Sequence, residues 1–101
     1  MRNRIVLVFT ILVFFALPLH AQERVTISGH ITDAESGEAL IGASFQVVEL
    51  STGALANEYG FYSITIPPGT YTLRYSFVGY DRIEIQAAIE KNLVRDAALK
   101  R

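Results

Sequence analysis

The sequence predicts an all-β fold, a sandwich of about seven short strands, and three observations predict it. Apolar and polar residues alternate with a period of two along most of the chain after Gln22, which is typical of half-buried strands. Clusters of Gly, Pro, Asn and Asp interrupt the alternation at intervals of roughly 8–12 residues, as turns do. No stretch after Gln22 shows a convincing helical stripe, and the best candidate, 87–99, fits the pattern of a strand better.

The first expected strand, 24–33, shows the alternation clearly. Its polar residues fall on one face, and its other face is expected to point inward with Val25, Ile27, Gly29 and Ile31. A turn over 33–38 should follow, because Asp33 can accept backbone N–H groups two residues on and Gly37 tolerates a positive φ. The chain then continues through a short apolar link, 39–42.

Two further strands are expected over 43–50 and 54–56, separated by a turn at 51–53. The turn 57–60 has Asn and Gly at its ends, which suits a tight reversal. It opens into the strand 61–66, whose inward residues are expected to be Tyr62, Ile64 and Ile66.

Pro67, Pro68 and Gly69 end that strand, and we expect them to make a hairpin into the next strand, 70–78. Tyr62 and Tyr71 would then meet across the hairpin as the centre of the core. After a bend at 79–81, a strand is expected over 82–86, a loop or bulge over 87–91, and a last strand over 92–99.

Residues 1–21 have the order of a secretory signal peptide. Arg2 and Arg4 supply the basic start, an almost wholly apolar run follows over 5–17, and Pro18 ends it shortly before Ala21. We expect cleavage after Ala21, which leaves 22–101 as one mature domain without a membrane span. An uncleaved anchor is the alternative, but the apolar run is shorter than the roughly 20 residues that a spanning helix needs.

Charge and cysteine content exclude several classes of function. With Arg2 and Arg4 in the leader, seven of the nine basic residues remain against ten acids, a net charge of −3 that argues against nucleic-acid binding. The absence of Cys excludes disulfides and thiolate metal ligands. Asp33, Glu35 and Glu38 lie together at a turn, but their spacing does not match a calcium loop, so we expect capping and solvation there.

No constellation of residues points to catalysis or to a cofactor. His30 is the only His after the leader, and it needs a nucleophile and an orienting acid to act as a base. Ser63 and Ser76 alternate as strand residues and lack the strand-to-helix turn of a nucleophile elbow. We therefore expect a protein that is not an enzyme.

Three aromatic residues are the candidate binding surface: Tyr59, Phe61 and Tyr80. Tyr59 lies in a turn, and Phe61 falls on the strand face opposite Tyr62. Exposed aromatic rings can stack on sugars or anchor a protein partner. The alternative is that these rings fold over the edge of the core and only pack.

Five blocks in order resemble the carboxypeptidase-like regulatory domain: 27–33 (ISGHITD), 37–43 (GEALIGA), 60–64 (GFYSI), 68–73 (PGTYTL) and 77–80 (FVGY). The resemblance implies a transthyretin-like (prealbumin-like) sandwich of about seven antiparallel strands. Blocks 60–64 and 76–80 also resemble the N-terminal extension of Bacteroidetes-type TonB-dependent outer-membrane receptors. In those receptors the domain follows the signal peptide and lies in the periplasm, ahead of a plug and a β-barrel.

The resemblance implies an exported, non-catalytic interaction module at the outer membrane, whose partner is the plug and barrel or the TonB machinery. The 101 residues hold neither plug nor barrel, so a receptor fragment, a truncated gene and a domain that acts alone all remain open. A stand-alone carbohydrate-binding module is one alternative function. An accessory domain of a secreted metallo-carboxypeptidase is the other, although the His and acid spacing of a zinc site is absent.

Overall fold

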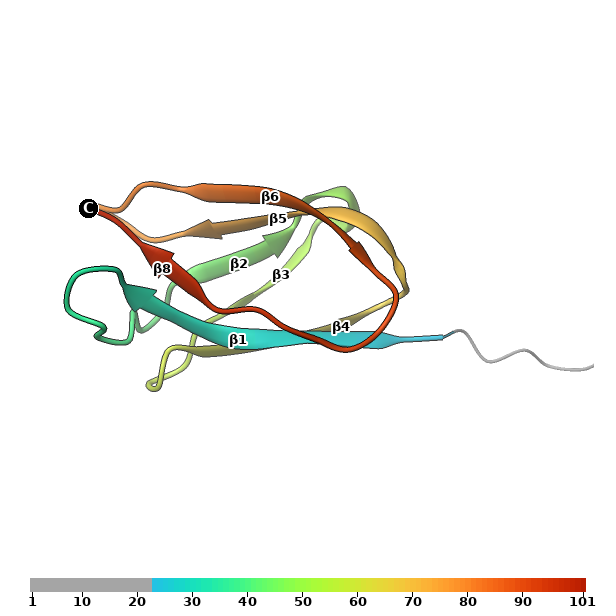
Figure 1. Ribbon diagram of the computed structural model, residues 1–101, viewed down its shortest axis with the longest axis horizontal. Coiled ribbons are helices and arrows are strands. Elements are labelled where there is room, and N and C mark those ends of the chain that lie inside the picture. The colour runs from blue at the N-terminus through green and yellow to red at the C-terminus, as the bar shows by residue number, and fades with distance from the viewer. Residues whose placement is uncertain (1–22) are drawn as a thin grey trace, which may run out of the picture.

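The computed structural model describes residues 23–101, and they form a β-sandwich of two four-stranded sheets (Figure 1). The prediction of an all-β fold is confirmed. The predicted signal peptide, 1–21, and its cleavage site lie outside the described residues. Within 23–101 the one helical element is η1 (Val48–Leu50), a single 3-10 turn.

The first sheet is built around the longest strand, β1 (Val25–Asp33), with β4 (Phe61–Ile66) on one side. On the other side lie β7 (Leu93–Val94) and β8 (Ala97–Leu99), which together occupy one strand position interrupted at 95–96. β4 is antiparallel to β1, but β7 and β8 run parallel to it. The expectation of a purely antiparallel sandwich is therefore wrong for this pair.

The parallel pairing follows from the course of the chain. β6 (Ile83–Ile89) belongs to the second sheet and runs toward the end of the sandwich where β1 begins (Figure 1). The chain then crosses to the first sheet and returns, so the returning strand has the direction of β1. The predicted loop or bulge at 87–91 is wrong in part, because Ala87 and Ile89 continue the inward face of β6 and pair with Tyr71 and Gly69.

The second sheet has the order β3-β2-β5-β6 and is antiparallel throughout. Its other strands are β2 (Ser44–Val47), β3 (Thr52–Leu55) and β5 (Gly69–Ser76). The strand predicted over 43–50 ends early, because Glu49 turns out of the ladder. Its carboxylate accepts hydrogen bonds from the backbone N–H and the hydroxyl of Thr72, both at 2.7 Å, and these bonds lower the pKa of Glu49.

Three aromatic rings from both sheets fill the centre of the core. Phe45 stacks on Tyr62 with 4.4 Å between ring centroids, and Tyr75 packs against both rings. The predicted hairpin between Tyr62 and Tyr71 is wrong, because the Pro67–Gly69 connection crosses from one sheet to the other. The core is therefore formed between sheets rather than within a hairpin.

The hydroxyl groups of this ring cluster are fully paired although they are buried. Tyr62 donates to the backbone carbonyl of Arg95, so its oxygen must accept from Tyr75, 2.8 Å away. Burial first, and the hydrogen bond with Tyr75 second, raise the pKa of Tyr62. Arg95 lies between β7 and β8 and passes directly over Gly29, where a side chain would collide with its carbonyl oxygen. The glycine thus lets the last strand close over the core.

Candidate functional site

The loops at one end of the sandwich carry most of the apolar side chains that are exposed to solvent. The end of β1, the loops 34–43, 56–60 and 77–82, and Arg101 all lie at this end, opposite the point where the described chain begins (Figure 1). We call it the loop end. Because loops of a sandwich are free of its internal packing, this is where a binding site is expected.

Backbone hydrogen bonds tie these loops to the sheets and to one another. Leu40 donates to Ile31 at 3.0 Å, and Ile31 donates in turn to Gly60 at 2.8 Å. Gly42 donates to Ala56 at 2.9 Å, which joins the first loop to the second. The loop end is therefore a fixed surface.

The turn that carries Tyr59 is held by a side chain. The Oδ1 atom of Asn57 accepts from the backbone N–H groups of Tyr59 at 2.9 Å and Phe61 at 3.1 Å. Gly60 has a φ of 76°, which favours glycine, and a Cβ there would come within 2.8 Å of the carbonyl oxygen of Ile31. The geometry directs the Tyr59 side chain outward, and it is 70% exposed.

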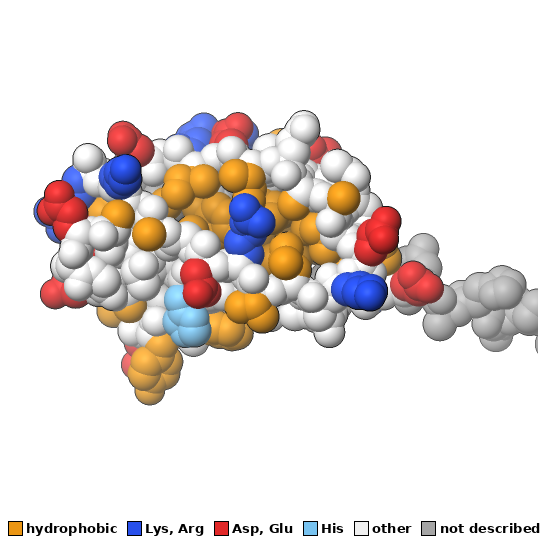
Figure 2. Space-filling view, in the orientation of Figure 1, with side chains coloured by type: hydrophobic (Ala, Val, Ile, Leu, Met, Phe, Trp, Pro, Cys, Tyr) orange, Lys and Arg blue, Asp and Glu red, His pale blue; other side chains and the backbone are white. Residues whose placement is uncertain are grey.

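Phe61 lies on the outer face of the first sheet, as its alternation predicts. It is paired with His30 on β1, and the two rings lie 5.4 Å apart. Asp96 accepts from the backbone N–H of His30 at 2.8 Å, while its distance to the His30 Nδ1 atom is 3.8 Å. Figure 2 shows this histidine beside apolar side chains and an acidic one at the surface.

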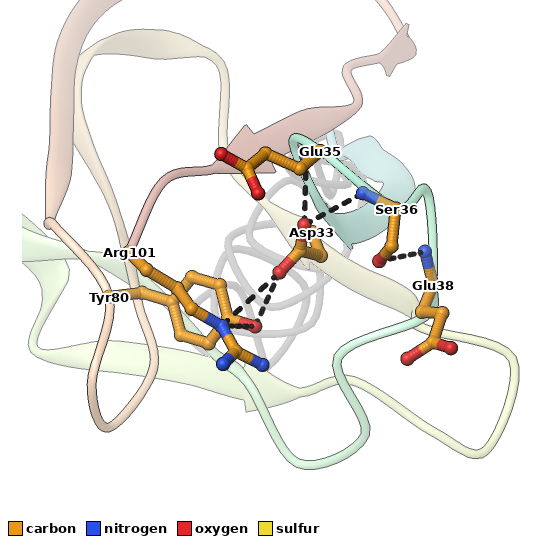
Figure 3. Close-up of polar contacts among 6 residues, drawn as sticks. All are labelled: Asp33, Glu35, Ser36, Glu38, Tyr80 and Arg101. Carbon is orange, nitrogen blue, oxygen red and sulfur yellow. Dashed lines mark hydrogen bonds and ion pairs between the residues drawn. The ribbon is translucent and has the colours of Figure 1, made fainter.

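Tyr80 has a different role from Tyr59 and Phe61. Its hydroxyl donates to the Asp33 carboxylate at 2.6 Å and accepts from the Arg101 Nε atom at 2.9 Å (Figure 3). The Arg101 guanidinium also lies 5.2 Å from the centre of the Tyr80 ring, and the ring packs against Phe77. Tyr80 thus joins the bend after β5 to the end of β1 and to the end of β8.

Asp33 is the centre of this group, which we call the Asp33 clasp: Asp33, Tyr80 and Arg101. Its carboxylate also accepts from the backbone N–H groups of Glu35 at 2.8 Å and Ser36 at 2.9 Å. The Tyr80 hydroxyl first, and the two N–H groups next, lower the pKa of Asp33 to about 2. The carboxylate is consequently held in its charged form by donors from two parts of the chain, the turn that follows it and Tyr80.

The acidic cluster predicted at this turn therefore caps the turn, as expected. Figure 3 shows Glu35 and Glu38 on the same turn as Asp33. Both are exposed, and Ser36 caps the backbone of Glu38 at 3.2 Å. Among residues 23–101, no group of three or more His, Asp or Glu side chains is placed to hold a metal ion.

Sequence reasoning missed two residues that extend the surface around Tyr59 and Phe61. Leu55 at the end of β3 is 70% exposed, and Ile41 in the first loop is 61% exposed. The bond between Gly42 and Ala56 brings their segments together. We call the four residues the loop-end patch: Ile41, Leu55, Tyr59 and Phe61. Their exposure could have been predicted, because both large aliphatic residues lie in or beside turns, where a side chain does not reach the core.

A shallow hollow of about 460 Å³ opens beside Gly42, next to this patch. Tyr80 lines it together with Phe77 and Val78 from the same bend, and Val78 is 93% exposed. The structure thus brings Tyr80 to the same end as Tyr59 and Phe61, although its ring pairs with neither of theirs. None of the residues 23–101 belongs to a helix that could cross a membrane.

Comparison with known proteins identifies the family. The model of the CarboxypepD_reg-like domain matches residues 27–101. The TonB-dependent receptor P3 of Formosa agariphila is 27% identical over 84% of the chain, and Bacillopeptidase F of Bacillus subtilis is 29% identical over 81%. The chain spans only 8% and 6% of the length of these two proteins.

Solved structures share the fold at lower identity. A chain of a type II cohesin–X-dockerin complex from Acetivibrio cellulolyticus superimposes with a TM-score of 0.62. The two are 22% identical, and the match covers 72% of this chain and 52% of the other. The sheets, the five sequence blocks and the family match agree, and the chain belongs to the CarboxypepD_reg-like domain family.

Proposed function

We propose that this chain is a non-catalytic interaction module exported to the periplasm, where it acts as the N-terminal domain of a TonB-dependent receptor. The observation that carries the proposal is the loop-end patch, four exposed apolar side chains on two loops and on the adjoining ends of β3 and β4, with the loops fixed by backbone hydrogen bonds. Apolar side chains that gather in the solvent at one end of a protein often mark a site for a partner. The distant homology to a TonB-dependent receptor supports an envelope protein as the setting.

The position of Arg101 supports a partner that lies close to the loop end. The Asp33 clasp holds Arg101 against Tyr80 and Asp33 (Figure 3), at the end of the sandwich that also carries the loop-end patch. A domain that followed in the same chain would therefore begin beside this surface. We propose that the patch packs against that domain or against the TonB machinery next to it.

The coding sequence after Arg101 tests the receptor assignment. An in-frame plug and β-barrel would support it, and a stop codon with no barrel would contradict it. A secreted peptidase domain downstream would instead favour an accessory module, the role suggested by the similarity to Bacillopeptidase F over the same residues. In that case a peptidase assay of the present chain with added zinc should still show no turnover.

Site-specific photo-crosslinking in intact cells tests the surface itself. A crosslinker at Tyr59 should yield a defined adduct with an envelope protein or with the downstream domain. The matched control is Val94, which is 76% exposed but lies on β7 away from the loops, and it should yield none. Equal adducts at both positions, or none at Tyr59, would contradict the proposed surface.

Carbohydrate binding is the second candidate, and the exposure of Tyr59 is the observation that favours it. A sugar would stack on that ring, so polysaccharide binding in a calorimetric titration should vanish in Tyr59→Ala. Lack of binding to a panel of polysaccharides at millimolar concentration would remove this candidate and leave the protein-interaction proposal standing.

A further inference from the structure

The four edges of the two sheets differ in how they are protected from pairing with other strands. β3 has four residues, and β7 and β8 are short and interrupted at 95–96. β4 is followed by Pro67, and its first carbonyl already accepts from Asn57 at 2.9 Å. Short length, proline and interruptions are the devices that keep edge strands from associating.

β6 has none of these devices. It pairs with β5 from Ile83 to Ile89 in an unbroken register, without a bulge or a proline. It ends the strand order of its sheet, and among residues 23–101 no strand pairs with its other side. A regular seven-residue edge of this kind is a template for another strand.

The backbone groups that β6 presents can be identified from the ladder. Thr72 directs its N–H away from β6, toward Glu49 on the β2 side. Successive residues of an antiparallel strand direct their backbone N–H and C=O groups to opposite sides. Gln86 is the β6 partner of Thr72, so its N–H and C=O groups point away from β5, into solvent. The same holds for Glu84 and Ala88, two residues to either side.

Apolar side chains also lie open along this edge. Ile83, Ile85 and Ala87 face inward from β6 but are only half-buried, as is Leu93 across the gap between the sheets. Figure 2 shows hydrophobic surface between the β6 edge and the strands β1 and β8, with a basic side chain over part of it. A neighbouring strand would cover this surface as well as pair the backbone.

We propose that the partner of this edge is a second copy of the chain, joined by antiparallel pairing of β6 with β6 around a two-fold axis at Gln86. The sequence of the strand is complementary to itself in this register. Arg82 falls opposite Glu90 of the second copy, and Glu84 falls opposite Ala88. On the inner face the half-buried Ile85 falls opposite the half-buried Ala87, a large apolar residue against a small one on each side of the axis. Ile83 falls opposite Ile89, which is already buried in the core of its own copy.

Two neighbouring registers place like charges opposite each other. Moving the axis to Glu84 places two Glu84 residues opposite each other, and moving it to Ala87 places Glu84 opposite Glu90. Like charges directly opposite each other destabilise a strand pair. In the register centred on Gln86, the charge of Glu84 stays paired within its own copy, where the Arg74 Nε atom on β5 donates to its carboxylate at 2.7 Å. A two-fold arrangement doubles each favourable pair.

Sedimentation equilibrium of the purified full chain tests the proposal. The chain should dimerise, and Gln86→Lys, which places two lysines on the axis, should weaken the dimer at least about tenfold. Ser63→Lys is the matched control, because Ser63 is likewise exposed and its backbone points off the edge of β4. It should leave dimerisation unchanged. Circular dichroism checks that each variant keeps its β-sheet spectrum.

Charge reversal tests the register independently. Arg82→Glu and Glu90→Arg should each weaken the dimer, because each places like charges opposite each other. The double variant should restore it, because the two positions then carry opposite charges again. A wild-type chain that stays monomeric up to about 1 mM would overturn the proposal. So would a dimer that Gln86→Lys leaves intact, or single reversals that the double variant fails to rescue.

Discussion

The ring cluster in the core and the loop-end patch contain similar side chains in opposite environments. Tyr62 in the cluster is 1% exposed, and every polar atom it buries is hydrogen-bonded. Tyr59, three residues earlier, is 70% exposed and sits on a turn that holds it away from the core. The difference separates the residues that determine folding from those available for binding, so substitutions in the two regions should have different consequences.

The largest expected effect is in the ring cluster. Phe45 is fully buried and contacts both Tyr62 and Tyr75, so Phe45→Ala should remove about 3–5 kcal/mol of the free energy of unfolding. Urea denaturation followed by circular dichroism measures it. Phe61→Ala is the matched control, because Phe61 is 38% exposed at the loop end and should cost much less. Equal losses would show that the two regions are not energetically distinct.

The next effect concerns the hydroxyl groups of the same cluster. Tyr62→Phe leaves both the Arg95 carbonyl and the Tyr75 hydroxyl without a partner, at a cost of about 1–3 kcal/mol. Tyr75→Phe removes only one donor to the Tyr62 oxygen and should cost less. The order of the two unfolding free energies is the test, and the reverse order would mean that Tyr62 does not donate to Arg95.

A smaller, pH-dependent effect is expected from the Asp33 clasp. The native state holds the pKa of Asp33 at about 2, below its ordinary value of 3.8. The stabilisation is therefore complete above about pH 4 and is lost as the pH falls toward 2. Asp33→Asn should flatten this part of a plot of unfolding free energy against pH.

Tyr80→Phe should flatten the same part of the curve only partly, because the backbone N–H groups of Glu35 and Ser36 still hold the carboxylate. A wild-type acid dependence in both variants would contradict the role of the clasp. An effect in Tyr80→Phe as large as that in Asp33→Asn would mean that the hydroxyl acts alone.

Much of the fold was predictable because burial imposes the alternation of residues. β4 was predicted with its observed bounds, and β1 began one residue later than expected. The sandwich was predicted from the same pattern, and the family from the resemblance of five short sequence blocks. The capping of the turn by Asp33 was predicted from the chemistry of one side chain, since Asp bonds to the backbone close by.

The pairing of strands was not predictable, because alternation reports which face is buried and not which strand is the neighbour. Pro67 to Gly69 has the composition of a hairpin, yet its strands lie in different sheets. The 3-10 turn at Val48–Leu50 depends on the distant Thr72, and the parallel course of β8 depends on where β6 ends. Such long-range contacts leave little trace in local sequence.

The candidate surface was predictable in part. The exposure of Tyr59 follows from its turn, and that of Phe61 from its strand face. The attachment of Tyr80 to Asp33 and Arg101 joins residues far apart in sequence, and local patterns hold no signal for it. Ile41 and Leu55 were missed because large aliphatic residues are assigned to a core by default.

The smallest expected effect gives the most direct test of the separation between the core and the loop-end patch. Ile41, Leu55 and Tyr59 are replaced together by Ser, and the free energy of unfolding is compared with that of the wild type in urea. Exposed side chains add little to folding, so we expect a change within about 1 kcal/mol. A loss as large as that of Phe45→Ala would show that the patch side chains stabilise the fold as core residues do and are not available to bind a partner.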